Sequence, residues 1–329
     1  MTFYRSIIRQ AILISWHNKY LWFFGLFATL LSSNFEIELV NRFTNGGATP
    51  YDFQRWWETG IFNGQTWINF FQLATTDTAT FISIILLVAV LITLAVAIIW
   101  LAIVSQVALV NSASKIISNA KKSINAKNHD TSLGLQEGRK HFWPVLGLQV
   151  LVRVLVYGLA ATTVIPVLLW VSKPTLTFSL AYLVIFLIFF AIALAISLVA
   201  KYAIAAITIK GQRFSQAISS SWDLFWKNWL VSLEMAFILF AISIIATFAI
   251  ILAILIVGIP VVFLLLLTLY LNSFILWVSV IAIGAIISFG ILIIGGSIVT
   301  VIQTVAWVTL YNQLNGKGVE SKLERVFGE

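Results

Sequence analysis

Long apolar runs separated by short polar segments follow one another along most of the chain. The run FISIILLVAVLITLAVAIIWLAIV (81–104) lacks the period of two that the strands of a membrane barrel require. A helix crosses the hydrocarbon core of a bilayer with about 20 apolar residues, and non-helical backbone finds no hydrogen-bonding partner in lipid. The pattern therefore predicts an all-α fold, a polytopic transmembrane helical bundle.

We expect about six spans in three helical hairpins, at residues 20–111, 142–200 and 229–311. In the first hairpin, an acidic and aromatic connection (34–78) is typical of an outer loop that rests on lipid headgroups. The first span is short. We expect it to be retained, not cleaved as a signal peptide, because LLSSNFE offers no small-residue cleavage site.

The third hairpin contains an ambiguous stretch. Residues 257–311 are too long for one span, and Gly258–Ile259–Pro260 would break a helix, as would the polar pair Asn272–Ser273. We therefore expect either a re-entrant segment or an extra span at residues 259–275.

The segments before the hairpins have helical periodicity. Residues 1–19, 112–141 and 201–228 are predicted to form amphipathic helices that lie in the membrane interface. Two apolar stripes carry this prediction: Tyr4, Ile7, Ile8, Ala11, Ile12 and Ser15, and Phe214, Ala217, Ile218, Ser221, Trp222 and Phe225.

These segments also repeat a motif. Gln10, Gln136 and Gln216 are each followed six positions later by an aromatic residue, and then by a span. We interpret each copy as a surface-helix module from which the chain turns into the membrane, so that the three hairpins share one orientation. The expected interfacial anchors are Trp16, Lys19, Trp22, Trp143, Trp222, Trp226, Lys227 and Trp229.

Composition and charge agree with this prediction. The 329 residues are 60% hydrophobic and 10% charged, whereas soluble domains carry about 25% charged residues. The net charge of +8 does not indicate nucleic-acid binding, because sixteen of the 20 lysines and arginines lie in residues 1–19, 111–141, 201–228 and 312–329, beside apolar runs. Such segments are typically cytoplasmic. We expect an inner-membrane protein with both termini, including the tail 312–329, in the cytoplasm, and anionic phospholipid as its partner. A protein partner or a second copy of the chain is left open.

Two ionisable residues lie inside predicted spans, where charge is costly and often functional. Arg153 is 17 residues past Gln136, and Glu234 is 18 past Gln216, which predicts similar depths and an ion pair between them. The pair would lock two hairpins together; a substrate or headgroup site is the alternative.

Other polar and small residues in spans predict helix packing. Gln106, Gln149 and Gln303 are expected to form interhelical hydrogen bonds. The expected close-packing positions of the last span are Gly284, Ser288, Gly296, Thr300 and Thr304.

Signatures of chemistry are missing. The chain has no cysteine and no HExxH, GxSxG, P-loop or dinucleotide motif, and His17, His129 and His141 are scattered. We expect no catalytic residues, no metal site and no cofactor.

Two segments carry a family resemblance. FSQAISSSWDLFWKNWLVSL (214–233) and VAWVTLYNQLNGKG (305–318) resemble the membrane domain of glycerophosphodiester phosphodiesterases and kindred uncharacterised bacterial membrane families, as does WHNKYLWFFGLFATLL (16–31). The phosphodiesterase activity belongs to a separate soluble barrel that these residues do not contain. The resemblance implies a bacterial inner-membrane protein with an accessory role.

The function expected is therefore a non-enzymatic scaffold that binds lipid or a partner, and the alternative is a transporter or lipid-translocating protein with a polar path in the bundle.

Overall fold

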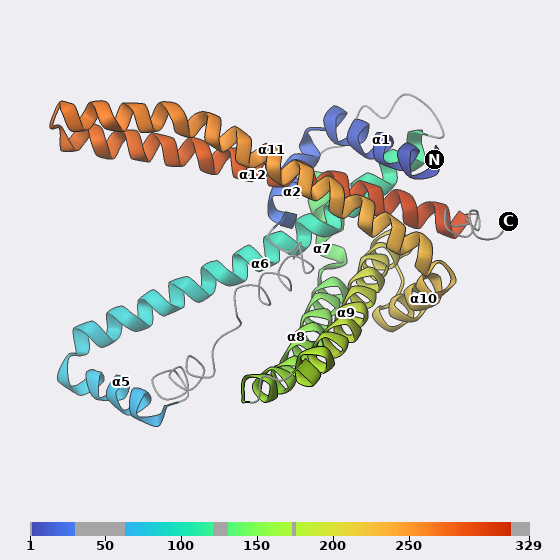
Figure 1. The fold of residues 1–329 in the computed structure, drawn as a ribbon, viewed down its shortest axis with the longest axis horizontal. Helices are drawn as coiled ribbons and strands as arrows, with labels where there is room; N and C mark the ends of the chain where they lie inside the picture. The colour runs from blue at the N-terminus through green and yellow to red at the C-terminus, as the bar shows by residue number, and fades with distance from the viewer. Residues whose placement is uncertain (1, 30–62, 121–130, 173–175, 317–329) are drawn as a thin grey trace. The chain divides into compact units, whose positions relative to one another are not determined.

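The computed structural model of the protein describes residues 2–29, 63–120, 131–172 and 176–316, which fold into ten helices (Figure 1). The helices are α1 (Thr2–His17), α2 (Tyr20–Thr29), α5 (Gly64–Thr76), α6 (Thr78–Ala120), α7 (Thr131–Lys140), α8 (Phe142–Ser172), α9 (Leu176–Lys210), α10 (Phe214–Lys227), α11 (Trp229–Tyr270) and α12 (Phe274–Gly316). The all-α prediction is confirmed for these residues.

Among the residues that the structure describes, five helices are long and apolar enough to cross a membrane: α6, α8, α9, α11 and α12. The multipass prediction is thus supported by helix length and composition. Of the predicted first span, only α2 is described; its 10 residues rise about 15 Å, half the thickness of the hydrocarbon core. The structure therefore supports five spans, not six, among the residues that it describes.

The chain divides into two compact units, residues 32–101 and residues 1–31 with 102–329. In the first unit, part of the predicted 34–78 loop is the helix α5, which buries no residue; residues 34–62 fall outside the described ranges. Asp77 caps α6 by accepting bonds from the Thr80 amide (3.2 Å) and hydroxyl (2.6 Å). These bonds hold the pKa of Asp77 below its usual value.

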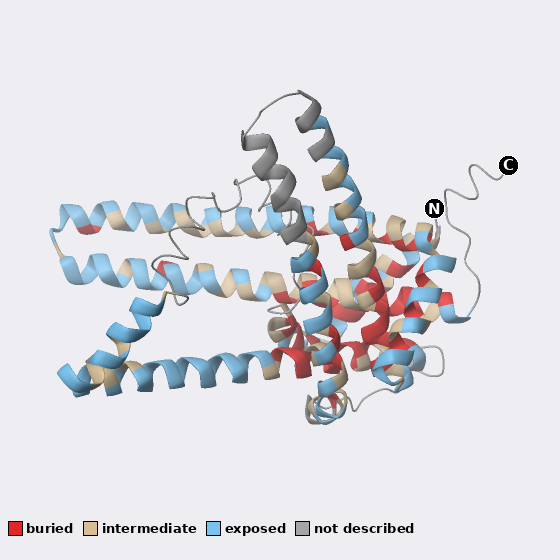
Figure 2. Ribbon diagram, turned by 90° about the horizontal axis from the view of Figure 1, so that it is seen from below, coloured by how far each residue is buried: buried red, intermediate tan, exposed pale blue. Residues whose placement is uncertain are grey.

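The core of the larger unit lies toward one end of each long helix (Figure 2). It combines residues 102–117 of α6, the starts of α8 and α11, and the last parts of α9 and α12, with α1, α2 and α10 packed against them. The other ends expose leucine, isoleucine and phenylalanine along their length, as in residues 244–267 of α11. Surfaces so apolar are expected of helices that face lipid.

Helix pairs pack along their length. α8 packs on α9 and α11 on α12, while α1 and α2 pack on α12 and α10 packs on α9. A Cβ on Gly284 would stand 2.9 Å from Val261, so the glycine is what allows α12 to lie this close to α11.

The re-entrant segment or extra span predicted at residues 259–275 is wrong. α11 continues without interruption through Pro260 to Tyr270, and the chain turns only at residues 271–273, where Asn272 adopts a φ of 48°. Proline is tolerated in such helices because neighbouring groups satisfy the backbone that it frees. The break predicted at Asn272–Ser273 is confirmed.

Two boundaries also differ from those predicted. α6 continues to Ala120 and α9 to Lys210, so the surface segments begin later than residues 112 and 201. Both extensions bury an apolar face, with Ala113 and Ile117 on α6 and Tyr202 to Ile207 on α9. Packing of these residues in the core keeps the helices intact beyond their most apolar stretch.

Candidate functional site

Three surface helices each end in a short break that leads into the next helix. α1 is followed by Asn18–Lys19 and α2, α7 by His141 and α8, and α10 by Asn228 and α11. At two breaks an asparagine amide bonds the carbonyl oxygen four residues back, Asn18 to Ile14 at 3.0 Å and Asn228 to Leu224 at 3.1 Å. These bonds satisfy carbonyl groups that a helix end leaves free. The structure therefore contains all three sequence modules as helix–break–helix units.

The apolar stripe of α1 packs against protein. Ile7, Ala11, Ile14 and Ser15 are buried in the core, and α1 lies on α12. The end of α12 therefore covers Ile7, Ala11 and Ser15 of the predicted stripe, whereas Ile12 of the same stripe stays exposed. Arg5, Arg9, Ile12, Leu13 and Trp16 remain exposed.

The predicted anchors at this module differ in exposure. Trp16 and Lys19 are exposed. Trp22 is half-buried: its Nε1 donates to the Ser15 carbonyl oxygen at 3.0 Å, and its ring meets that of Trp16 edge to face with 5.7 Å between centroids.

The stripe of α10 divides between core and surface. Ala217, Ser221 and Phe225 are buried. Trp222, Trp226 and Trp229 are exposed, Trp226 by 60%, and Lys227 is exposed beside them. The rings of Trp222 and Trp226 meet edge to face with 6.0 Å between centroids. All four anchors predicted here lie on the outside of the fold.

Glycines fix α7 against neighbouring helices. A Cβ on Gly138 would stand 2.5 Å from the Val104 carbonyl oxygen of α6, and one on Gly134 would stand 2.8 Å from the Phe24 ring of α2. These two glycines are not among the predicted packing positions, although their spacing of four residues is the usual signal for close helix packing. Trp143, just past the break, is 76% exposed, as expected of an anchor.

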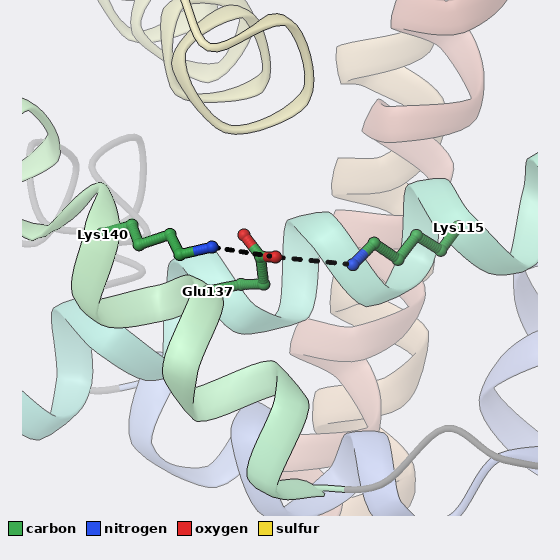
Figure 3. A network of polar contacts seen from close by, with 3 residues as sticks. All are labelled: Lys115, Glu137 and Lys140. Carbon is green, nitrogen blue, oxygen red and sulfur yellow. Dashed lines mark ion pairs between the residues drawn. The ribbon is translucent and has the colours of Figure 1, made fainter.

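Two lysines, Lys140 of α7 and Lys115 of α6, flank the carboxylate of Glu137. Glu137 Oε1 lies 3.5 Å from Lys140 Nζ and 4.0 Å from Lys115 Nζ of α6, with the two ammonium groups on opposite sides of it (Figure 3). All three side chains are substantially exposed.

Polar residues inside the long helices bond between helices. Gln149 of α8 donates to Gln106 of α6 at 3.0 Å, and Gln303 of α12 donates to Ser243 of α11 at 2.6 Å. These are interhelical bonds of the kind that the sequence analysis expects of the three glutamines.

Arg153 and Glu234 form no ion pair among the residues that the structure describes. Arg153 is exposed on α8, and Glu234 accepts a 2.5 Å hydrogen bond from the Tyr4 hydroxyl of α1. The depth comparison fails because the modules differ in length. Gln136 lies six residues before α8, but Gln216 lies thirteen before α11, so Arg153 is about six residues, or roughly 9 Å, further along its helix than Glu234.

The predicted packing positions of α12 meet two helices. Gly284 lies against α11, and Gly296 lies against α2, where an added Cβ would stand 3.6 Å from Thr29 Cγ2. The Thr300 and Thr29 hydroxyls are 2.9 Å apart. Thr304 bonds only the Thr300 carbonyl oxygen of its own helix, and Ser288 is half-buried.

Several contacts between helices were not predicted from the sequence. The Tyr202 and Ser232 hydroxyls are 2.7 Å apart and join α9 to α11. Lys201 Nζ lies 4.9 Å from the centroid of the Trp307 ring, and Lys210 Nζ donates to Asn315 Oδ1 at 2.9 Å. From the sequence, both lysines are only charges beside a span, because their aromatic and amide partners lie about a hundred residues away.

No group of histidine, aspartate and glutamate side chains able to hold a metal occurs within the described residues. His17 and His141 lie apart in separate modules, and His129 falls outside the described ranges.

No family model, curated protein or solved structure matches the chain.

Proposed function

We propose that this chain is a non-enzymatic multipass protein of the bacterial inner membrane whose cytoplasmic face binds anionic phospholipid through its three surface-helix modules. Exposed tryptophans and basic residues recur at each module: Trp16 with Lys19, Trp143 with Lys140, and Trp222, Trp226 and Trp229 with Lys227. Tryptophan favours the headgroup region, and basic side chains reach lipid phosphates.

The two-faced structure of α10 is the observation that carries the proposal. Its buried face is occupied by the core, so the exposed tryptophans are not needed to hold the fold together. Trp222 and Trp226, left outside this packed helix, and Trp229 at the start of α11 need another apolar environment, and lipid at headgroup depth supplies one. The excess of lysine and arginine at the modules favours the cytoplasmic leaflet, where anionic lipid concentrates.

Electrostatics and anchoring together suggest a scaffold role. A basic surface near the cytoplasmic leaflet gains about 1 kcal/mol per lysine or arginine from anionic lipid. Three rigid modules joined to one core would hold that surface at a fixed depth, which suits a protein that organises lipid or presents a partner to it.

Single spin labels test the proposal, because the chain has no cysteine and each introduced cysteine is unique. Labels at Trp222→Cys and Trp226→Cys are compared with one at Gln216→Cys, which is exposed elsewhere on α10. In bilayers containing phosphatidylglycerol, we expect the two former labels to meet oxygen more readily than a water-soluble nickel complex, and the Gln216 label to show the reverse. Equal access of the nickel complex to all three labels would refute the proposal.

The alternative, a transporter with a polar path, makes a different prediction. Cysteines at positions 106, 149, 153 and 234 would then be reached by water-soluble thiol reagents in the membrane. In the structure, the Gln106 and Gln149 side chains bond each other and Glu234 bonds Tyr4. These contacts favour a packed interior, and inert cysteines at all four positions would support the scaffold.

A further inference from the structure

The Lys115–Glu137–Lys140 cluster joins α6 and α7 with an excess of positive charge. One carboxylate lies between two ammonium groups, so the three side chains carry a net charge of +1. The exposed side-chain fractions are 50%, 31% and 60% for Lys115, Glu137 and Lys140. Pairs as long and as exposed as these are weak, because water screens them. The carboxylate is therefore held loosely and can be replaced.

The cluster rests on a rigid base. Gly134 and Gly138 bring the α7 backbone against α2 and α6, and a side chain at either position would collide with Phe24 or Val104. The backbone positions from which the two lysines extend are thus set by helix packing. Because the two helices are already in place, binding an anion between the lysines orders only their side chains, which lowers the ordering cost.

We propose that Glu137 is the internal counterion of a phosphate-binding site, and that a lipid phosphate displaces it from Lys115 and Lys140. The inference rests on the proposed function, since it names the group of anionic phospholipid that one module binds. A phosphodiester has the charge and the acceptor oxygens to bond two lysines, as the carboxylate does in the unbound protein. Trp143, three residues past Lys140, is exposed, and in the proposed site its ring packs against the glycerol or upper acyl region of the same lipid.

The proposed site predicts whether each of three substitutions raises or lowers the affinity for the anion. Glu137→Gln keeps the shape of the side chain but removes the competing charge, so we expect it to tighten binding by about threefold to tenfold. Lys115→Gln and Lys140→Gln each remove an attraction and should weaken binding by about the same factor. Arg139→Gln removes the same charge from an exposed neighbour of Lys140 and is the matched control, expected to change binding by less than about twofold.

A fluorophore at Ser118→Cys reports binding in the full-length protein in non-ionic detergent. Ser118 is exposed, one helical turn past Lys115. The protein is titrated with dioctanoyl phosphatidylglycerol and, separately, with inorganic phosphate. A response to the lipid alone, with the expected order of variants, identifies a lipid headgroup as the ligand. The same order with inorganic phosphate also supports the site and identifies free phosphate as sufficient.

Three outcomes would overturn the inference: no response to either ligand, a Glu137→Gln variant that binds no more tightly, or an Arg139→Gln variant that loses as much as Lys140→Gln. The last would indicate diffuse surface charge. None of these measurements involves α10. If the titration fails but the spin labels on α10 face lipid, the proposed function stands and only the phosphate site is refuted. If the titration succeeds but the labels on α10 face water, the proposed function is refuted and an anion site remains.

Discussion

Gly25 lies on α2 where α12 passes, and a Cβ at this position would stand 2.7 Å from the Ser297 carbonyl oxygen and from Val301 Cγ2. On the same contact, the Ser297 hydroxyl donates to the Trp22 carbonyl oxygen. The backbones of α2 and α12 therefore touch, and a single methyl group is enough to separate them. Glycine allows this contact because it has no side chain to collide with the neighbouring helix, and the same holds for Gly134 and Gly138 on α7.

We expect Gly25→Ala to lower the stability of the purified protein by about 1 to 3 kcal/mol, because backbone and a branched side chain meet the added carbon. Thermal unfolding in detergent would measure the loss as a lower Tm. Gly158→Ala on α8 is the control, because nothing lies within 4 Å of its Cβ; alanine there should change stability by at most about 1 kcal/mol, in the stabilising direction. Equal Tm values for the two variants would contradict the α2–α12 contact.

The surface helices have one face in the core and one face outside. On α10, Phe225 is buried and Trp222 is exposed. Both are large and apolar, and periodicity alone places them in the same stripe. The helix that packs beneath decides which part of that stripe is protein-facing, and only the remainder is available for lipid.

The hydrogen bond between Gln149 and Gln106 is expected to stabilise the contact of α8 with α6. Gln149→Leu should destabilise the protein by about 0.6 to 1.7 kcal/mol, because it leaves the Gln106 side chain without the amide that bonds it. The double variant with Gln106→Leu should lose less than the two single losses combined, since it removes both polar groups. Denaturation in mixed micelles measures the cycle.

Gln303→Leu serves as the comparison for that cycle. Its partner is Ser243, so it belongs to the contact of α12 with α11. Its effect should add to that of Gln149→Leu. Additive losses for Gln106 and Gln149 would mean that their bond contributes nothing to stability.

Across the larger unit, packing is concentrated toward one end of the long helices, whereas their apolar remainders are exposed (Figure 2). α11 and α12 have 42 and 43 residues, about twice what the hydrocarbon core requires. The surface helices and most of their basic residues belong to the packed end. This distribution fits a bilayer around the exposed ends, and our proposal assigns the packed end to the cytoplasmic interface.

Labelling of intact cells checks this orientation. Ser273→Cys, in the turn between α11 and α12, should react with a membrane-impermeant maleimide added outside, once the reagent has passed the outer membrane. Gln216→Cys on α10 should react only after the inner membrane is opened. The opposite pattern would reverse the topology, and it would assign the basic modules to the outer leaflet.

The sequence determined the helical class, the membrane environment and the three modules, because each follows from local quantities: the length of an apolar run, its periodicity and the charges beside it. The asparagine–serine turn between α11 and α12 was predictable for the same reason. The re-entrant segment was mispredicted because proline is a strong breaker only where the backbone it frees meets no partner.

Only the tertiary structure decided which groups meet. The Arg153–Glu234 pair was inferred from equal offsets along the chain, but helix starts set depth, and these differ between modules. Glu234 bonds Tyr4 across 230 residues, and Gly138 lies on Val104 because α7 packs on α6. A residue's spacing along its own helix is fixed by backbone geometry, whereas its partner on another helix depends on how two surfaces pack, which no local pattern encodes.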